Sequence, residues 1–527
     1  MKQLLTIAIY LISAISILSQ ERLNIVNILV DDMGYSDIAC YGGEIDTPNI
    51  NSLAEGGLRF SSYRTYPKCG PTRTAMLMGV ESETSSANAI SFTEALKSSG
   101  YQCYHVGKLH GPLKDKEETL HEYGFDRSFG NTAGGNFFDH TLNQCYLDGK
   151  KWHTDKEFYK TDVQTDFALE FLESNKSTNK PFYLQLWYHA PHFPIQTKPK
   201  DIAKYKGMYS ELPEFYRKQR FERQKEMGLV KNSWKLPPSH DSENEYAKLS
   251  QEDREKYALV LQTYAGMLDC VDQNIGRVIA KLKEMGVYEN TMIIFSSDNG
   301  STVECGQSGK FPGTMKERFG KKYDENAPVG SRNAHWGIGG IWANVANTPY
   351  SKFKMWCHEG GISSPLIIHL PGKIKNPGSI DHTNVFVWDF FPTFLEIAKT
   401  SLPDKHEKRN PQKLIGDSLL PLILNGKLGK QDRKAYFTMG KSSCFIKGNW
   451  KIVRARDKTV DPETVPWELY NLSEDRTEVN NLVSTMPEKL QEMTAAYKTH
   501  LETNNITKKQ PKNLKKSSKK KSKKSKK

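Results

Sequence analysis

The sequence predicts an α/β fold with buried parallel strands, followed by a smaller C-terminal antiparallel subdomain. Residues 24–30, NIVNILV, form a continuous apolar run rich in β-branched side chains, which indicates a strand buried on both faces. Residues 292–295, MIIF, repeat this design later in the chain. Beyond Ser401 the pattern changes to short runs typical of a small antiparallel sheet, at residues 435–439, 444–447, 450–454 and 468–472.

Predicted helices and strands alternate between these regions, as an α/β fold requires. Residues 47–54 begin with Thr-Pro, which predicts a helix because proline fits a first helical turn. Residues 257–285 carry apolar side chains at helical spacing, so we expect a long helix packed on the core. The highly charged residues 198–254 are predicted to be a surface insertion. Further strands are expected at residues 58–63, 101–106, 181–188 and 365–369, and further helices at residues 92–98, 162–174 and 385–398.

The N-terminal end of the chain has the pattern of a secretory signal peptide. Residues 1–19 carry Lys2, then an apolar run, then small and polar residues. The run is too short for a convincing membrane span, and no later segment is apolar enough to form one. We therefore expect a mature protein that is secreted or periplasmic, without a transmembrane segment.

The positive charge of the chain is concentrated at the other end. The formal net charge is +13, and residues 508–527 contain 12 lysines and no acid, so residues 1–507 carry 13 − 12 = +1. Such a Lys/Ser run cannot bury a core and is expected to be disordered. It has no aromatic residues, which argues against nucleic-acid binding. We interpret it as a solvated tail, with contact to acidic polysaccharide or anionic surfaces as the alternative.

Paired oxygen-bearing side chains follow both buried runs. Asp31 and Asp32 come directly after the first run, and Asp298 and Asn299 after the second, each pair preceding a glycine. Ligands of open α/β sheets bind beyond the carboxyl ends of parallel strands. The alternative interpretation is that these acids are turn or helix-cap residues, but adjacent acids at a buried strand are costly without a cation. An all-oxygen set predicts Ca²⁺ or Mg²⁺, and not zinc or copper.

Residues 67–79, PKCGPTRTAMLMG, predict a sharp turn that leads into a helix. Pro71 fits the first turn, so Cys69 lies at the helix N-terminus, where a negative charge is favoured. Arg73 follows one turn later, so its guanidinium can reach the same place. Taken alone, the pattern also fits a half-buried structural cysteine beside a surface arginine.

The pattern Cys69-x-Pro71-x-Arg73, followed by a short apolar helix and glycine, resembles the sulfatase signature. The resemblance implies that a formylglycine-generating enzyme converts Cys69 to formylglycine, and that the aldehyde is hydrated so that one hydroxyl attacks sulfur. It also implies that the oxidised Cys69 joins the strand-end acids in binding the cation, and that Arg73 helps to stabilise the sulfuryl charge. The departures from the commonest form are Gly70, Thr72 and Met78.

Three more segments resemble conserved parts of this family. Residues 107–110, GKLH, match its G-K-x-H segment, which implies that Lys108 clamps sulfate and His110 is the base acting on formylglycine. Residues 354–361, KMWCHEGG, match K-x-x-x-x-E-G-G, which makes Lys354 the second sulfate-binding lysine.

The third segment, residues 189–194, HAPHFP, resembles the strand-end H-x-P motif. Prolines around His192 restrict its backbone, which suits a side chain that must be aimed. The resemblance implies that His192 binds the substrate and protonates the departing alcohol, with His189 as the competing candidate.

The resemblance extends over residues 24–482. It closes with a match to L-Y-D-L-x-x-D-P-x-E-x-x-N-L at residues 469–482, from which Asn471, Arg476 and Thr477 depart. It implies an alkaline-phosphatase-like fold, a large mixed, mostly parallel sheet sandwiched by helices. The chain then divides into the signal peptide (1–19), a sulfatase catalytic domain (20–400), a C-terminal α+β subdomain (401–507) and the Lys-rich tail (508–527).

Residues 301–353 are far longer than a connection needs, and are rich in glycine and aromatic residues. They are either an irregular excursion packed by its own aromatics or a substrate-binding rim beside the sulfate pocket. In the second interpretation a sugar ring stacks on Trp336 or Trp342, and Arg332 or His335 contacts a neighbouring polar or anionic group. This interpretation favours a sulfated carbohydrate over an aryl sulfate as substrate.

The sequence thus predicts a type I sulfatase that uses formylglycine and a divalent cation. Two alternatives remain open at this point. Phosphonate monoester and phosphodiester hydrolases of the same superfamily also use formylglycine. A non-catalytic glycan-binding homologue would keep Cys69 unmodified, but it would be expected to lack part of the acid–base set, whereas His110 and His192 are both present.

Overall fold

The structure is a computed structural model that describes the main body of the chain. The described residues are 22–81, 89–111, 117–132, 135–142, 144–178, 180–304, 310–314, 324, 326–426, 432–455, 465–504 and 506. The predicted signal peptide and the Lys-rich tail lie outside these residues, so both stay predictions. The division into domains likewise stays a prediction.

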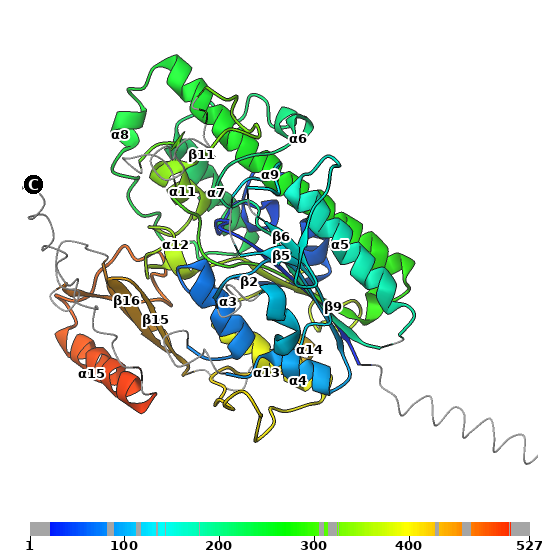
Figure 1. The fold of residues 1–527 in the computed structure, drawn as a ribbon. Coiled ribbons are helices and arrows are strands. Elements are labelled where there is room, and N and C mark those ends of the chain that lie inside the picture. Colours follow the sequence, from blue (N-terminus) through cyan, green and yellow to red (C-terminus); the bar gives the residue numbers. More distant parts are fainter. Residues whose placement is uncertain are drawn as a thin grey trace, which may run out of the picture.

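A ten-stranded sheet forms the centre of the molecule (Figure 1). Its five middle strands, β9-β1-β8-β4-β5, are all parallel, whereas β12, β6 and β7 run antiparallel to their neighbours. The predicted mixed, mostly parallel sheet is therefore confirmed. In order across the sheet the strands are β13 (Ile380–Asp381), β2 (Gly57–Phe60), β12 (Leu366–His369), β9 (Thr291–Ser297), β1 (Asn24–Val30), β8 (Phe182–Trp187), β4 (Gln102–Lys108), β5 (Arg127–Asn131), β6 (Cys145–Leu147) and β7 (Lys150–Trp152).

Helices cover both faces of the sheet. Successive residues of a strand point to opposite faces, so an apolar strand places apolar side chains on both faces. In β1, Val26 and Ile28 belong to one apolar cluster, while Ile25 and Leu29 belong to another. Figure 1 shows α5 and α9 on one side of the sheet, and α3, α4 and α13 on the other. The first cluster includes α2 (Pro48–Glu55), α5 (Lys160–Asn175), α7 (Pro213–Met227), α9 (Gln251–Glu284) and α11 (Gly339–Ala346). The second includes α3 (Cys69–Met78), α4 (Phe92–Ser98), α13 (Phe390–Ala398) and α14 (Leu420–Asn425).

The C-terminal part forms a separate antiparallel sheet, as predicted. Its strands in order are β15 (Lys434–Met439), β16 (Ser442–Lys447), β17 (Trp450–Arg454) and β18 (Trp467–Asn471). One face packs on α15 (Pro487–Thr503), where Phe445, Ile452 and Tyr497 belong to one apolar cluster. The other face carries Phe437 and Cys444, which belong to the core of the large sheet. This small sheet is therefore anchored to the main body by a shared core.

Short elements link these layers. They are β3 (Tyr63–Arg64) paired with β14 (Val385–Phe386), β10 (Gly313–Thr314) paired with β11 (Trp336–Gly337), and the helices α6 (Pro199–Ala203), α8 (Glu243–Tyr246) and α12 (Glu359–Ile362).

The segment at residues 198–254 is not a surface insertion throughout, which corrects the sequence prediction. Its helix α7 buries Arg220, whose guanidinium donates to Asp37 at 2.9 Å and to Glu44. The prediction rested on charged composition alone, whereas an arginine can be buried when its guanidinium forms charge-assisted hydrogen bonds with carboxylates.

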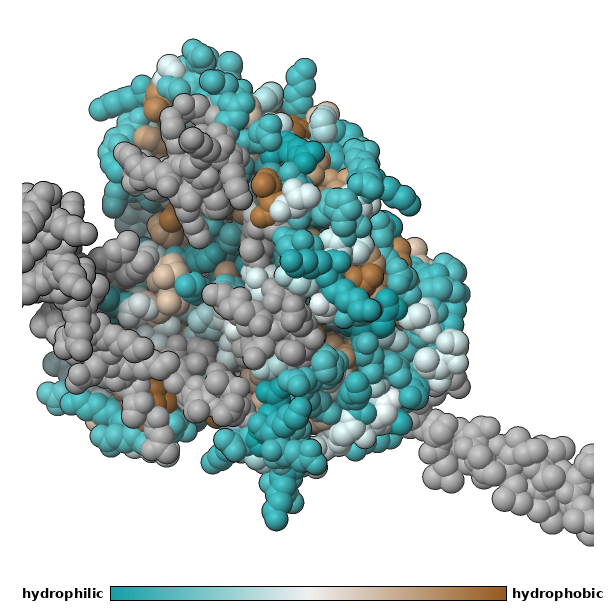
Figure 2. All heavy atoms as spheres, in the orientation of Figure 1, coloured by the Kyte–Doolittle hydropathy of each residue, from teal (hydrophilic) through white to brown (hydrophobic). Residues whose placement is uncertain are grey.

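The surface of the described part is mainly polar. On the face drawn in Figure 2, hydrophobic residues are scattered among hydrophilic ones. Among the described residues, no helix is long and apolar enough to cross a membrane.

Candidate active site

The two acidic turns predicted from the sequence lie side by side at the carboxyl end of the sheet. Strands β1 and β9 are neighbours, with Val30 opposite Ser297, so the residues that follow them meet. The Asp298 amide donates to the Val30 carbonyl at 3.1 Å, and the Asp32 amide donates to the Asp298 carboxylate at 3.2 Å. Asp32 adopts the left-handed conformation (φ 66°), which a non-glycine residue rarely takes outside a constrained site.

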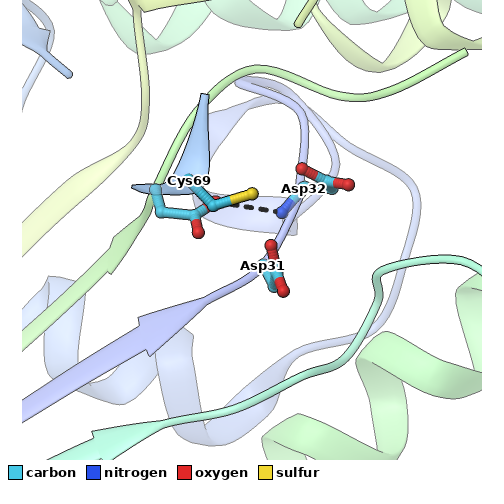
Figure 3. Close-up of side chains that lie close together, drawn as sticks. Asp31, Asp32 and Cys69 are labelled. Atoms are coloured by element: carbon cyan, nitrogen blue, oxygen red, sulfur yellow. Dashed lines mark hydrogen bonds between the residues drawn. The ribbon is translucent and has the colours of Figure 1, made fainter. Parts of the chain in front are cut away.

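Cys69 lies opposite these turns, as the first residue of α3. Figure 3 shows its side chain directed toward the turn that carries Asp31 and Asp32. The ligand atoms of Asp31, Asp32, Asp298 and Cys69 all lie within 4.8 Å of one another. Burial raises the pKa of the Cys69 thiol to about 12, although Lys108 and Lys354 oppose this shift, so the thiol is neutral. Because the thiolate is the reactive form of cysteine, an unmodified Cys69 is a poor nucleophile.

Each carboxylate of the site lies beside a lysine or an arginine side chain. Arg73 donates to Asp298 from Nε at 3.0 Å and from Nη2 at 2.7 Å. Lys354 Nζ lies 2.8 Å from Asp32 Oδ2, and Lys108 contacts Asp31. We call these three acids and three cations, together with Cys69 and Asn299, the catalytic cluster. All of its members are at most 7% exposed.

Burial and neighbouring charges move the acid pKa values in opposite directions. Burial would raise the pKa of Asp31, but the positive charges of Lys108, His192, Arg73 and Lys354 hold it well below its usual range. Burial and then the charge of Asp31 raise the pKa of Asp298 to about 6, although Arg73 opposes this shift. Three acids in one buried site thus compete for positive charge.

The oxygen atoms of the cluster fit a hard divalent cation. Asn299 donates through Nδ2 to Asp32 Oδ1 at 2.7 Å, which leaves its own carbonyl oxygen Oδ1 as an acceptor. Among the described residues, neither Asn299 Oδ1 nor Asp31 Oδ1 has a hydrogen-bond partner, although both are buried. Buried acceptors are normally satisfied. Carboxylate and amide oxygens that converge in this way suit Ca²⁺ or Mg²⁺.

The two candidate histidines of the H-x-P segment have different surroundings. The His192 side chain is 14% exposed, its Nε2 lies 3.4 Å from Asp32 Oδ2, and its Nδ1 lies 2.7 Å from the Phe193 carbonyl. His189 is buried, and its Nδ1 contacts Gln164 Nε2 at 2.7 Å. Burial and then the charge of Lys160 hold the pKa of His189 well below its usual range. Of the two, His192 is therefore the one that reaches the open side of the cluster.

His110 lies next to the start of α3. A Cβ atom added at Gly70 would lie 3.3 Å from His110 Nε2, so this histidine packs directly on the residue after Cys69. Burial, followed by the charges of Lys108 and Arg73, lowers the pKa of His110 to about 3. A neutral imidazole in this place can accept a proton.

One carboxylate near the cluster was not predicted from the sequence. Glu304 Oε2 lies 3.6 Å from His192 Nε2, on the loop that begins at Asp298. Glu304, His192 and Asp32 bring their ligand atoms within 4.8 Å of one another. The signal for this residue was available, because it follows the same strand, β9, as Asp298 and Asn299.

The two tryptophans proposed to stack on a sugar are both buried in the structure. Trp342 is 1% exposed and Trp336 is 7% exposed, so neither offers an open ring face. Trp342 packs against Tyr209, Tyr216 and Tyr246 at centroid distances of 5.6, 5.6 and 6.2 Å. These tyrosines lie in residues 198–254, so the described rings against which Trp342 packs belong to another segment of the chain and not to its own.

The two polar side chains proposed for the rim differ from each other. Arg332 is exposed, pairs with Asp139 at 2.6 Å and lines an open pocket of about 740 Å³. This pocket also contains Phe138, Phe158 and Lys156. His335 is buried, and burial lowers its pKa.

Comparison with known families gives two matches. Residues 23–400 match the family described as Sulfatase. Residues 350–507 match the family described as N-sulphoglucosamine sulphohydrolase, C-terminal.

Individual relatives agree with these matches. An uncharacterized sulfatase of Schizosaccharomyces pombe is 30% identical over 523 residues, which cover 90% of this chain and 92% of the relative. An arylsulfatase of Klebsiella aerogenes is 31% identical and covers 76% of this chain and 92% of its own length. An N-acetylglucosamine-6-O-sulfatase of Bacteroides thetaiotaomicron is 25% identical, with 88% and 83% covered.

Solved structures share the fold. A protein described as Ps i-CgsB in complex with k-i-k-neocarrahexaose superposes with a TM-score of 0.65 at 21% identity, and covers 91% of this chain and 93% of its own. A second structure, described as a complex with its substrate D-glucosamine-2-N,6-O-disulfate, has a TM-score of 0.62 at 21% identity, with 92% and 98% covered.

Proposed function

Because the chain belongs to the sulfatase family, we propose that it hydrolyses a sulfate ester of a carbohydrate by means of formylglycine and one divalent cation. The formylglycine derives from Cys69, and a formylglycine-generating enzyme is the partner needed for its maturation. The cation is Ca²⁺, with Mg²⁺ as the alternative, and its ligands are the oxidised Cys69 and Asp31, Asp32, Asp298 and Asn299.

The observation that carries this proposal is the balance of charge around Cys69. Three carboxylates and three cationic side chains sum to −3 + 3 = 0 within the buried catalytic cluster. A bound divalent cation changes that sum to +2, which suits the anionic oxygens of a sulfate ester. The buried acceptors Asp31 Oδ1 and Asn299 Oδ1 gain a partner in the same step.

In this proposal, each group of the site has a separate role in the reaction at sulfur. One hydroxyl of the hydrated aldehyde gives its proton to a carboxylate of the catalytic cluster and attacks sulfur as the bond from sulfur to the ester oxygen breaks. The second hydroxyl then re-forms the aldehyde as the bond to the sulfate oxygen breaks and sulfate is released. When bound, the cation supplies Lewis-acid stabilisation of negative charge. Lys108, Lys354 and Arg73 surround the sulfuryl oxygens; Arg73 Nη1 is a buried donor without a hydrogen-bond partner among the described residues. A single well-placed donor of this kind contributes about 2.7–4 kcal/mol to transition-state stabilisation.

Two histidines move the protons in this proposal. His192 holds one proton on Nδ1, which donates to the Phe193 carbonyl, and its Nε2 faces the pocket. A proton on Nε2 passes to the departing alcohol oxygen. His110, neutral beside the start of α3, accepts a proton from the second hydroxyl as sulfate leaves. Acid–base catalysis of this kind contributes about 10²–10⁴-fold.

The relatives support a carbohydrate as the substrate. One relative is an N-acetylglucosamine-6-O-sulfatase, and one structural neighbour is a complex with a disulfated glucosamine. We also propose that residues 1–19 direct export to the periplasm or medium, and that the lysine-rich residues 508–527 contact anionic surfaces or glycans.

The test is a panel of sulfated mono- and oligosaccharides, assayed for released sulfate beside an aryl sulfate and an aryl phosphonate. The proposal predicts turnover of at least one glycan and of the aryl sulfate, with the phosphonate slower. Preferential turnover of the phosphonate would favour the phosphonate monoester hydrolase alternative. Binding of glycans without release of sulfate by the mature protein would favour the non-catalytic alternative.

A further inference from the structure

A second buried charge cluster lies between the large sheet and the small one. Its centre is Glu359, whose two carboxylate oxygens accept from Arg64 Nε at 3.0 and 3.1 Å, Lys451 Nζ at 2.9 Å and Arg476 Nε at 2.8 Å. Lys451 also lies 2.7 Å from Glu478 Oε1. We call these five residues the Glu359 cluster. The side chains of these ion pairs are at most 4% exposed.

The members of this cluster come from distant parts of the chain. Arg64 lies on β3, directly before the segment that leads to Cys69, and Glu359 begins α12. Lys451 lies on β17, and Arg476 and Glu478 follow β18. The C-terminal part of the chain thus contributes three charged side chains to the site of Glu359, one from β17 and two from the segment that follows β18. Arg476 is one of the departures from the family's closing pattern, in which proline occupies this position.

Glu359 ends the loop that carries Lys354 into the catalytic cluster. At its start, the Lys354 amide donates to the Ser301 carbonyl at 2.9 Å, and the Met355 amide donates to the Pro67 carbonyl at 2.7 Å. In its middle, the Cys357 amide donates to Ser442 Oγ of β16 at 3.0 Å. At its end, the Glu359 amide donates to Glu478 Oε2 at 2.8 Å.

Close packing leaves this loop little freedom to adjust. We call Asp298 and Asn299, two of the proposed metal ligands, the metal turn. A Cβ atom added at Gly300, directly after the metal turn, would lie 1.9 Å from the Gly360 carbonyl oxygen. The Gly300 amide also donates to the Gly361 carbonyl at 3.3 Å. A displacement of Glu359 therefore reaches the metal turn on one side and Lys354 on the other.

We propose that Lys451 and Arg476 are positioning residues, which act through Glu359 to hold Lys354 in register with Cys69 and the metal turn. This inference rests on the proposed role of Lys354 as a sulfate-binding lysine. It gives the small C-terminal sheet a part in catalysis, although none of its strands contributes a side chain to the catalytic cluster. Displacements of about 1 Å at a catalytic group are enough to cost on the order of 10²-fold in rate.

The test is a double-mutant cycle between Lys451 and Lys354. Lys451→Met removes the charge but keeps most of the side-chain length, and Lys354→Met removes the group on which the effect should act. The kcat/KM for an activated aryl sulfate is measured in the wild-type protein, both single variants and the double variant. The urea midpoint of each protein is measured beside it.

Arg433→Met is the matched control. Arg433 is nearly buried, donates to the buried Asp389 at 2.8 Å and lies just before β15 of the same small sheet. Its hydrogen bonds connect the small sheet to Asp389, the residue that precedes α13. Its hydrogen bonds and ion pairs among the described residues do not involve the Lys354 loop. Its loss should lower the urea midpoint without an effect that depends on Lys354.

The inference predicts that Lys451→Met lowers kcat/KM by about 10–100-fold in the wild-type background, the usual range for partners that orient a functional group. In the Lys354→Met background the same change should cost less than about 2-fold, because coupled residues are not additive. Arg433→Met should lower kcat/KM only slightly, and by the same factor in the wild-type and Lys354→Met backgrounds.

Two results would overturn the inference. One is an equal loss from Lys451→Met in both backgrounds, and the other is a lower urea midpoint with unchanged kcat/KM. Full activity of Lys354→Met would instead refute the proposed role of Lys354, and the inference with it. If Lys451→Met does not fold, Arg476→Met is taken through the same cycle, and it must show the same dependence on Lys354.

Discussion

The two buried charge clusters of this protein are built from the same residue types but are satisfied in different ways. In the Glu359 cluster, both oxygens of the central carboxylate accept hydrogen bonds from cationic side chains. In the catalytic cluster, Asp31 Oδ1 and Asn299 Oδ1 are buried without hydrogen-bond partners among the described residues. The central carboxylate of the first arrangement is fully paired within the protein. Beside it, Arg64 Nη2 and Glu478 Oε1 have no hydrogen-bond partner among the described residues, although Glu478 Oε1 forms an ion pair with Lys451. The second arrangement instead keeps unpaired oxygens where two acidic turns converge on Cys69, which suits a bound ion.

This difference distinguishes a structural ionic network from a functional one. A buried charge is tolerated when its pairing is complete, and removal of one partner is then strongly destabilising. Buried acceptors without partners lower the stability of the folded protein. A cluster that keeps them around a reactive position is therefore expected to serve function. Changes in the catalytic cluster should therefore affect turnover and ion binding, and changes in the Glu359 cluster should affect stability and the position of the Lys354 loop.

The largest expected effect is that of Cys69→Ala, which should lower turnover by about 10⁴–10⁶-fold, in line with loss of a nucleophile in other enzymes. The far-UV spectrum and the urea midpoint should stay close to those of the wild type. Cys103→Ala, at a buried cysteine of β4 outside both clusters, is the control and should keep its turnover. Full turnover of Cys69→Ala would contradict the assignment of the nucleophile.

Glu359→Gln should have the next largest effect, and on stability. The change removes the carboxylate charge that pairs with Arg64, Lys451 and Arg476. Loss of one partner from a buried ion pair should lower the free energy of unfolding by about 3–5 kcal/mol. Glu170→Gln is the control, because its surface pair with Arg127 spans 3.4 Å between exposed side chains and contributes about 0–1 kcal/mol. Equal losses from the two variants in urea unfolding would remove the contrast between the clusters.

Asp298→Asn should act on the ion and on turnover. We expect a loss of about 10²–10³-fold in kcat, comparable to loss of one strong electrostatic contact in the transition state. After chelation, Ca²⁺ should raise the unfolding temperature of the wild type, since a ligand at about 100 times its Kd adds about 2.7 kcal/mol. The variant should lose this response, whereas Asp389→Asn, at a buried acid outside the cluster, should keep it. A calcium response preserved in Asp298→Asn would place the ion elsewhere.

The smallest expected effect is that of Trp342→Phe, at a residue outside both clusters. Loss of packing against three tyrosines should lower the free energy of unfolding by about 1–2 kcal/mol. The ratio of KM values for a sulfated oligosaccharide and an aryl sulfate should not change. A selective rise in KM for the oligosaccharide would restore Trp342 as part of the substrate-binding surface.

The sequence predicted those features that depend on local pattern. Asp31 and Asp298 could be paired because each follows a buried strand, and parallel strands end at the same edge of a sheet. Arg73 could be placed about one helical turn after Cys69 by its spacing. The structure begins α3 at Cys69 itself, whereas the sequence placed Cys69 just ahead of the helix. Lys354 was identified only through resemblance to a family, because it lies on a loop whose course no periodicity reveals.

Features that depend on tertiary packing were missed or misjudged. Arg476 was noticed as a departure from the family pattern, but its partner Glu359 lies 117 residues away in sequence. Trp342 was assigned to a substrate rim because burial cannot be read from an aromatic residue in a glycine-rich segment. The helix α15 was also missed, although its residues have a hydrophobic side that packs on the small sheet.

The central claim is that residue 69 is formylglycine in the active enzyme. Mass spectrometry of the proteolytic peptide that contains Cys69, taken from enzyme purified from its native host, tests this most directly. The account predicts the mass of the aldehyde or its hydrate in place of the thiol, and reaction of that peptide with a carbonyl reagent. A peptide that carries only the thiol, in a preparation with full sulfatase activity, would contradict it.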